Sequence, residues 1–379
     1  MKRKFKLLSF ALYDSGETVL GALLFSTLYP LYITQHVDVK TYSVLYGIAF
    51  FISFLVALQL GRIADHRGLR KGFFTLFSLC VPLLCLTLFI SFNRAELNFV
   101  LYLLLAIFHQ QALVFYNSLL KSFETKGFAS GFGVALGYAG SALSLIFLAP
   151  VLTLPSAFVW VGLIFFLLSL PSVVSLSEPE ERQKVVLREL FRDRGFLLTM
   201  ASMLLLMELA HTMIAMMGVY LREVYGLSER DIYRTIGFSA LGGISGGLLF
   251  GRLTDRISAQ RLFPLGFLLW SAFLLLLYIT PRDFLLPLGF FAGLCLAHLW
   301  TTSRILLLER FTRGDVAVRF SFYSLSERIA SSLGLIFWSF FLLITGENYR
   351  LSALLMLIFP SMGALLYLLS NRRFEVKRL

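Results

Sequence analysis

The sequence predicts an all-α membrane protein with twelve transmembrane helices in two bundles of six. Three observations lead to this prediction. The 379 residues are 58% hydrophobic and only 15% charged, whereas a soluble domain has about a quarter of its residues charged. The apolar residues gather in stretches of about 20, the length of a helix that crosses a bilayer. A polar connector in the middle of the chain separates two groups of six such stretches.

The apolar stretches follow one another with short loops. We expect spans at 10–33, 41–61, 72–92, 97–120, 129–150, 155–176, 195–221, 231–251, 261–281, 283–306, 317–345 and 348–370. Only the sixth and seventh spans are joined by a long polar segment. The sequence therefore predicts an N-terminal bundle over 1–176, a connector over 177–194 and a C-terminal bundle over 195–379.

Lys and Arg residues are distributed unequally between the two sides of these spans. Of 34 such residues, 25 fall on the side of the termini and connector and 7 on the other side. Because basic residues accumulate in cytoplasmic loops, we expect both termini to be cytoplasmic, in a multi-pass protein of a prokaryotic cytoplasmic membrane. The basic N-terminal segment precedes an apolar run too long for a signal-peptide core, so we expect it to be retained.

The composition also excludes several classes of function. The net charge is +12, but the basic residues lie in short runs between apolar stretches, so we expect no nucleic-acid partner. The three cysteines, Cys80, Cys85 and Cys295, lie in apolar segments without metal-ligand spacing. No Walker loop or HExxH motif occurs. We expect no enzyme activity, cofactor or metal, and a monomer whose partners are a small-molecule solute and the lipid bilayer.

A loop sequence recurs in the two halves of the chain. GRIADHRGLRK begins at Gly61 and GRLTDRISAQR begins at Gly251, 190 residues later, which is half the chain. Gly, Arg and Asp recur in register. Two halves with one repeated motif indicate internal duplication.

The first copy resembles the loop signature of the major facilitator superfamily, G-x-x-x-D-R-x-G-R-[RK]. The resemblance implies two six-helix bundles, with the third, sixth, ninth and twelfth helices facing lipid. We predict a cytoplasmic charge latch between helices, and an ordinary positive-inside loop is the alternative. The residues of this gating motif are Gly61, Arg62, Asp65, Arg67, Gly68, Arg70, Lys71, Gly251, Arg252 and Asp255.

A narrower resemblance links both halves to one branch of that superfamily. The stretches YDSGETVLGALLFSTLYPLYI from Tyr13, YNSLLKSFETKGFASGFGVALGYAGSALSL from Tyr116, TTSRILLLERF and RFSFYSLSERIASSLG are similar to the UMF1/Atg22-like branch. This resemblance implies amino-acid export.

Ionisable and polar residues inside the spans are the candidate site. A charge in the hydrocarbon core costs about 2.5–3.5 kcal/mol on insertion scales, so such residues normally face a wet cavity or each other. The charged candidates lie on spans that the resemblance assigns to the cavity. The substrate-site and proton-site candidates are Asp14, Glu17, His109, Gln110, Asn117, Glu208, His211, Arg304, Glu327 and Arg328.

Glu208 and His211 stand three residues apart, so they share a helix face and could share a proton. Shifting Glu17 by 190 residues lands next to Glu208, so each half carries an acid at a similar depth of its first helix. Three interpretations remain: proton coupling, static ion pairs and direct contact with the solute. Arg304 and Arg328 supply fixed positive charge, either for a carboxylate or phosphate or to neutralise Asp14 or Glu309.

Two further patterns concern helix packing. The polar stripe from His109 to Gln111, with Asn117, would suit hydrogen bonds to a zwitterion or between helices. Glycines at 133, 137 and 140 and at 242, 243, 246, 247 and 251 form small-residue faces that predict close helix contact.

These observations predict a secondary transporter that moves a small polar or zwitterionic solute by alternating access. The best specific hypothesis is proton-coupled amino-acid efflux. A lipid, amphiphile or drug exporter is the alternative within transport. A membrane sensor that binds without translocating is the alternative from another class.

Overall fold

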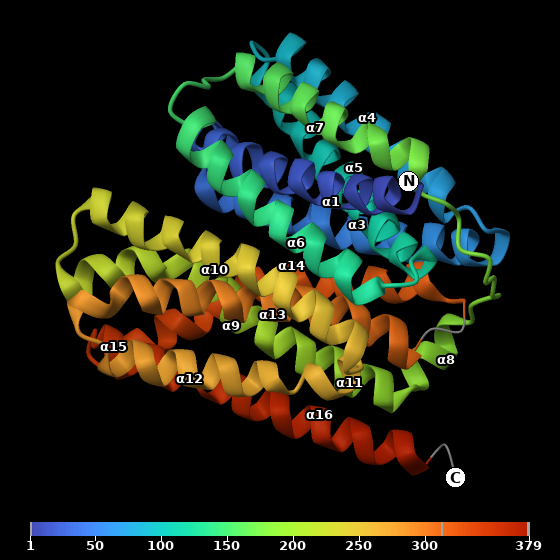
Figure 1. Cartoon of the computed structure of the whole chain (residues 1–379). Helices are drawn as coiled ribbons and strands as arrows, with labels where there is room; N and C mark the ends of the chain where they lie inside the picture. The colour runs from blue at the N-terminus through green and yellow to red at the C-terminus, as the bar shows by residue number, and fades with distance from the viewer. Residues whose placement is uncertain (1, 312–313, 377–379) are drawn as a thin grey trace. The chain divides into compact units, whose positions relative to one another are not determined.

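The computed structural model describes residues 2–311 and 314–376, and these residues contain helices but no β-strand (Figure 1). Twelve helices in this part of the chain are long and apolar enough to cross a membrane. They are Arg3–Ile33, Thr41–Arg67, Arg70–Ile90, Ala95–Ser122, Lys126–Leu148, Ser156–Ser175, Arg194–Tyr225, Glu229–Arg256, Ala259–Ile279, Arg282–Phe311, Val316–Ile344 and Tyr349–Asn371. The twelve predicted spans are confirmed.

The first half of the chain contains the following elements: α1 (Lys2–Leu20), η1 (Gly21–Leu28), α2 (Tyr29–Ile33), α3 (Val39–Arg67), α4 (Arg70–Ile90), α5 (Ala95–Leu119), η2 (Leu120–Ser122), α6 (Lys126–Leu143), η3 (Ser144–Leu148) and α7 (Ser156–Ser175). Helix α1 packs on α6 and α7, α4 packs on α5 and α7, and α3 packs on α5.

The second half contains α8 (Leu187–Arg192), α9 (Arg194–Tyr225), α10 (Glu229–Arg256), α11 (Ala259–Leu262), α12 (Leu265–Ile279), η4 (Arg282–Phe284), α13 (Leu285–Phe311), α14 (Val316–Ile344), α15 (Tyr349–Leu355) and α16 (Ile358–Val376). Helix α10 packs on α13 and α9 packs on α16. The predicted ninth span is divided into α11 and α12, and the twelfth into α15 and α16.

The chain divides into two compact units. The first unit is Met1–Val185 with Thr312–Ser324, and the second is Val186–Phe311 with Leu325–Leu379. The start of α14 therefore belongs to the first unit and its remainder to the second. The bundle boundaries expected from the sequence, at 176 and 195, stay a prediction.

Polar side chains fix several helix starts, as free backbone N–H groups require. The Asp193 carboxylate accepts bonds from the amides of Gly195 and Phe196 at the start of α9. Ser228 caps α10 in the same way, and Asn348 caps α15.

The first span differs from the plain helix expected over 10–33. It begins at Lys2, and its middle, η1, is a π-helix of eight residues. The Tyr29 amide bonds to the Leu24 carbonyl, and the Thr27 hydroxyl to the Ala22 carbonyl at 2.7 Å. Short π segments inside helices occur frequently at functional sites.

Both glycine ladders form close helix contacts, as predicted. On α6, a Cβ at Gly137 would lie 3.2 Å from the Thr18 hydroxyl of α1. On α10, a Cβ at Gly242 would overlap the Phe290 carbonyl of α13. Figure 1 shows α1 beside α6, and α10 beside α13. The absence of side chains thus lets the backbones approach.

The assignment of the third, sixth, ninth and twelfth spans to the lipid stays a prediction. The second and eleventh spans are at least as exposed within the structure as those four. The predicted site residues nevertheless all lie on α1, α5, α9, α13 and α14.

Candidate functional site

In the first unit, the side chains of Glu17 on α1 and His109 on α5 lie close together. The Glu17 Oε1 atom lies 3.4 Å from His109 Nε2, and the two side chains are 17% and 3% exposed. The ring of Phe25, on η1, lies 5.1 Å from the imidazole. This pair joins the first and fourth spans through the charges that the sequence singled out.

Asp14 lies one turn earlier on α1 and contacts a different helix. Its buried carboxylate lies against Gly133 of α6, where a Cβ would collide with Oδ2. The Thr18 hydroxyl bonds to the Asp14 carbonyl at 2.6 Å and the Gly137 carbonyl at 3.1 Å. Asp14 therefore belongs to the α1–α6 seam, whereas Glu17 turns toward α5.

The polar residues of α5 differ in their contacts. Two of them bond to neighbouring helices, and the third has an oxygen with no hydrogen-bond partner among the described residues. The Gln110 amide donates to the Ser324 hydroxyl of α14, and the Gln111 amide donates to the Ser53 carbonyl and hydroxyl of α3. These bonds support the interpretation as contacts between helices. Asn117 is buried, and its Oδ1 atom has no hydrogen-bond partner among the described residues.

In the second unit, Glu208 and His211 lie on α9. Glu208 is buried, and its Oε1 atom and the His211 Nε2 atom have no hydrogen-bond partner in residues 2–311 and 314–376. The imidazole packs 5.4 Å from the ring of Trp300 on α13. The guanidinium of Arg328, on α14, acts on His211 electrostatically. A buried carboxylate oxygen without a partner is costly, so Glu208 is the strongest candidate for a proton or solute site.

Helix α14 approaches α9 closely beside this acid. A Cβ at Gly334 would overlap the Thr212 hydroxyl and lie 2.9 Å from the Glu208 carbonyl. Thr212 donates to that carbonyl at 2.7 Å. Packing and this hydrogen bond therefore hold the backbone around Glu208. Its side-chain Oε1 atom, in contrast, has no hydrogen-bond partner among the described residues.

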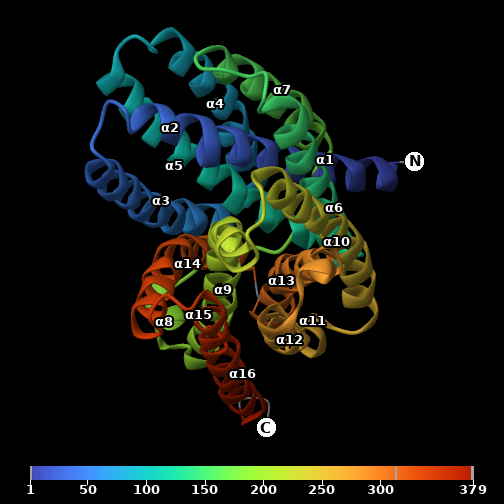
Figure 2. The same cartoon turned by 90° about the vertical axis from the view of Figure 1, so that its left-hand side faces the viewer.

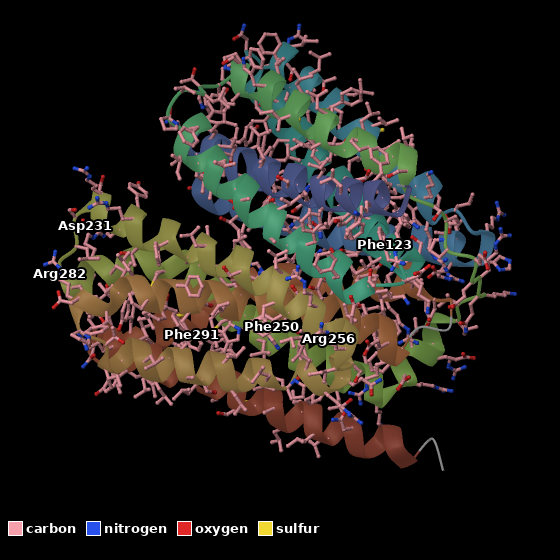
Figure 3. The ribbon with its side chains drawn as sticks, viewed as in Figure 1. Phe123, Asp231, Phe250, Arg256, Arg282 and Phe291 are labelled. Atoms are coloured by element: carbon pink, nitrogen blue, oxygen red, sulfur yellow. The ribbon has the colours of Figure 1, made fainter. Side chains whose placement is uncertain are left out.

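The other predicted charges of the second unit lie on α13 and α14. Arg304 is buried, whereas Glu327 and Arg328 are half-buried. The Glu309 carboxylate accepts a bond from the Ala259 amide at 2.8 Å, at the start of α11. His298 is also buried on α13, its Nε2 atom lies 3.0 Å from the Leu262 carbonyl, and Phe250 (labelled in Figure 3) packs edge-on against it.

The first copy of the repeated motif forms a buried ion pair at the end of α3. Arg70 Nε lies 2.7 Å from Asp65 Oδ1, and both side chains are fully buried. The carboxylate also accepts bonds of 3.0 Å from the amides of Ala317 and Val318, at the start of α14. Gly61 packs against the same backbone. The motif therefore joins the ends of α3 and α4 to the start of α14, and its role as a latch stays a prediction.

Arg70 extends the latch to the connector. Its guanidinium donates to the Glu181 carbonyl at 2.9 Å and to the Gly314 carbonyl at 2.6 Å, and lies 3.6 Å from the Glu178 carboxylate. The Lys71 amide donates to Glu178 as well. Sequence reasoning missed these connector residues, because a solvated linker gives no periodic signal.

The remaining members of the motif lie outside this buried pair. Arg62 and Arg67 are exposed, and Gly68 has a positive φ of 70° with the Arg182 side chain packed against it. In the second copy, Gly251 is buried but Arg252 and Asp255 are exposed. The two copies are therefore equivalent in sequence but not in burial.

Within the described residues, no group of three or more His, Cys, Asp or Glu side chains could hold a metal ion.

Comparison with known proteins shows a relative and a partial family match. An uncharacterized protein from Aquifex aeolicus (strain VF5) is 55% identical over 367 residues, covering 97% of each chain. A family model described as Major Facilitator Superfamily matches residues 235–379, in the C-terminal part of the chain. This part of the chain is therefore similar to that superfamily, whose proteins are transporters rather than enzymes.

Solved structures of several transporters share the fold. A bacterial homologue of the iron transporter ferroportin, in an outward-facing state, has a TM-score of 0.75 at 15% identity, over 98% of this chain and 100% of the other. The human organic anion transporter MFSD10 has 0.73 at 14%, over 97% and 98%. FucP in the outward conformation has 0.76 at 12%, over 98% of both. These similarities establish the superfamily fold.

Proposed function

We propose that the chain is a secondary active transporter that moves a small polar or zwitterionic solute by alternating access. The superfamily fold supports this general function. Amino-acid efflux is the specific case, supported by the resemblance to the UMF1/Atg22-like branch. The 55% identity to a bacterial protein supports a prokaryotic membrane.

The observation that most supports a polar solute is the environment of Glu208. Among the described residues, one Glu208 carboxylate oxygen has no hydrogen-bond partner, and His211, one turn later on α9, is acted on by the fixed positive charge of Arg328. A solute ammonium group could bind the acid, and a solute carboxylate could bind the guanidinium. A zwitterion carries both groups.

Proton coupling would use the same acid. A carboxylic acid in a poorly hydrated site can change its protonation near neutral pH, so Glu208 could carry a proton in one half of the transport cycle. The fold is compatible with such coupling, since FucP is a fucose:proton symporter.

The test is transport by purified protein in proteoliposomes. A panel of amino acids, organic anions and sugars is screened by counterflow, and the solute found is then followed with and without an imposed pH gradient. We expect the gradient to accelerate net transport by the natural chain. Glu208→Gln should lose the response to the gradient, because it cannot release a proton, and should exchange the solute less well in counterflow, because it cannot pair with a solute ammonium group.

Glu96→Gln is the matched control, since Glu96 is exposed at the start of α5. It should behave like the natural chain. If the gradient has no effect and Glu208→Gln keeps full activity, proton coupling at Glu208 is wrong. If solutes bind but none is exchanged in counterflow, the chain is a sensor rather than a transporter. Preference for amphiphiles over zwitterions would instead support a lipid or drug exporter.

A further inference from the structure

The first part of the connector is packed against the first unit. We call residues 177–183 the strap. The strap contains no helix or strand, yet Pro179 within it is buried and the Arg182 side chain lies against Gly68. A linker that only joined two bundles would be exposed and would make few contacts. The strap is therefore a folded part of the first unit.

The strap supplies hydrogen-bonding groups to the ends of two helices. Helix α4 begins after Leu69, whose side chain makes no capping bond. The Glu178 carboxylate accepts the Lys71 amide at 2.6 Å and so caps α4 from the connector, where negative charge is favourable. The Gln183 amide donates to the Asp65 carbonyl at 2.9 Å, in the last turn of α3. Figure 2 shows α3 and α4 on either side of α5 in the first unit.

The charges of the strap complement those of the helices beneath it. The Glu178 carboxylate lies 3.6 Å from the buried guanidinium of Arg70, and the Glu181 carboxylate lies 3.2 Å from the Lys121 ammonium of η2. Contacts between opposite charges that are partly shielded from water are stronger than those on an open surface. The two acids therefore tie the strap to the start of α4 and to the segment after α5.

The strap also covers the loop before α14. Arg70 donates to the Glu181 carbonyl at 2.9 Å and to the Gly314 carbonyl at 2.6 Å. Gly314 has a positive φ of 97°, and a Cβ there would lie 3.0 Å from the Gln183 Cβ atom. The start of α14 belongs to the first unit, whereas the rest of this helix belongs to the second. The strap and Arg70 thus hold the beginning of a helix that continues into the second unit.

We propose that Glu178 is a positioning residue for the transport cycle. Through Arg70 it holds the loop before α14 on the first unit, and release of the strap frees the start of α14. This inference rests on the proposed transport function, because alternating access requires each end of the protein to open in turn. Neutralising Glu178 removes one counter-charge of a buried guanidinium, so the hold of Arg70 on the Gly314 carbonyl weakens.

The test measures how fast a buried cysteine at the start of α14 reacts with N-ethylmaleimide. Val318→Cys is the reporter in a chain whose three native cysteines are changed to alanine. Val318 is fully buried, and only its main-chain amide bonds to Asp65, so that bond persists in the reporter. Glu178→Gln should increase the rate of modification at least about fivefold, the effect of losing one partly shielded ion pair at a helix start.

A second reporter separates release of the strap from general loosening of the first unit. Native Cys85 of α4 is also fully buried, and a chain that keeps it as the single cysteine is modified under the same conditions. Glu178→Gln should leave its rate unchanged. Purified full-length protein in lipid nanodiscs is used for both reporters, and mass spectrometry follows the modification.

Two further variants complete the experiment. Glu180→Gln is the matched control, since it makes the same change of charge within the strap at an exposed side chain, and it should react like the natural strap. Glu178→Ala removes the acceptor for the Lys71 amide as well as the charge. It should therefore accelerate the reaction of Val318→Cys more than Glu178→Gln does.

The outcomes separate this inference from the transport function, because the reaction needs no solute. An unchanged rate at Val318→Cys in both Glu178 variants would overturn the positioning role, and transport would stand if a solute is exchanged in counterflow. An equal increase at Cys85 would overturn it too, since Glu178 would then only stabilise the unit. A selective increase at Val318→Cys, without counterflow of any solute, would support the hold on α14 and contradict transport.

Discussion

At the residue scale, the Asp65 carboxylate has two structural roles. It neutralises the buried guanidinium of Arg70, and it accepts the amides of Ala317 and Val318 at the start of α14. A buried ion pair contributes little by itself, but removal of one partner leaves a charge without compensation. The stability of the surrounding protein therefore depends more on this buried carboxylate than on the exposed charges of the loop.

We predict that Asp65→Asn destabilises the protein by about 3–5 kcal/mol, because Arg70 would keep its charge in a buried site. Thermal unfolding of the purified protein in detergent measures the effect. Asp255→Asn changes the equivalent residue of the second copy, which is exposed, and should alter stability by less than about 0.5 kcal/mol. Equal losses for the two variants would contradict the difference in burial.

The acids of the two first helices also differ at this scale. The sequence repeat places Glu17 and Glu208 at nearly equivalent positions. In the structure Glu17 pairs with His109, whereas one Glu208 oxygen has no hydrogen-bond partner among the described residues. Sequence reasoning could identify both acids, because charge within an apolar run is conspicuous. It could not rank them, because the partners come from helices distant in sequence.

At the scale of elements, glycine faces decide which helices touch. On α10, Gly242 faces the backbone of α13, while Gly237 has nothing within 4 Å of a Cβ position. The sequence pattern places Gly242, and not Gly237, in a small-residue face, but it does not tell which helix that face meets. The difference depends on the neighbouring helix.

We predict opposite effects of alanine at these two glycines. Gly242→Ala should destabilise by about 1–3 kcal/mol, since its methyl group must displace the Phe290 carbonyl. Gly237→Ala should be neutral or stabilise by up to about 1 kcal/mol, because alanine favours helix over glycine. Unfolding temperatures in detergent compare the two. Loss of stability in Gly237→Ala alone would show that the seam is assigned to the wrong face.

The π-helix in the first span is an element that hydropathy could not predict. The run from Val19 to Ile33 carries no charged residue, so any helical geometry satisfies the need to cross the membrane. A π segment inside an α-helix is rare, and Phe25 within it packs against Tyr102 and His109 of α5. These neighbours come from tertiary packing, which hydropathy does not encode.

At the scale of the whole molecule, several polar contacts lie together at one end of the first unit. Arg3 lies 2.8 Å from Glu124, and Lys6 donates to the Ser122 carbonyl and to Ser177. The Lys6 ammonium also lies 4.8 Å from the ring centre of Phe123 (Figure 3). The N-terminus, the loop after α5 and the start of the connector thus share one end, as the alternation of loops predicts.

We predict that this end is cytoplasmic, because it carries most of the Lys and Arg residues. Single cysteines replace two exposed acids, in Glu124→Cys at this end and in Glu96→Cys at the other. The background is a chain whose three native cysteines, two of them buried, are changed to alanine. A membrane-impermeant maleimide should modify Glu96→Cys in intact bacterial cells, and Glu124→Cys only after permeabilisation. The reverse pattern would invert the orientation.

The sequence by itself determined the twelve spans, the repeat and the set of charged candidates, since hydropathy and scarce charge are local properties that the bilayer makes decisive. It also identified Asp65 and Arg70 as members of one motif. Only the tertiary structure decided that Asp65 meets the start of α14, that Glu17 meets His109, and that Glu208 lies beside α14. Each of these contacts joins helices far apart in the chain, and no local pattern encodes which side chains meet once the helices have packed.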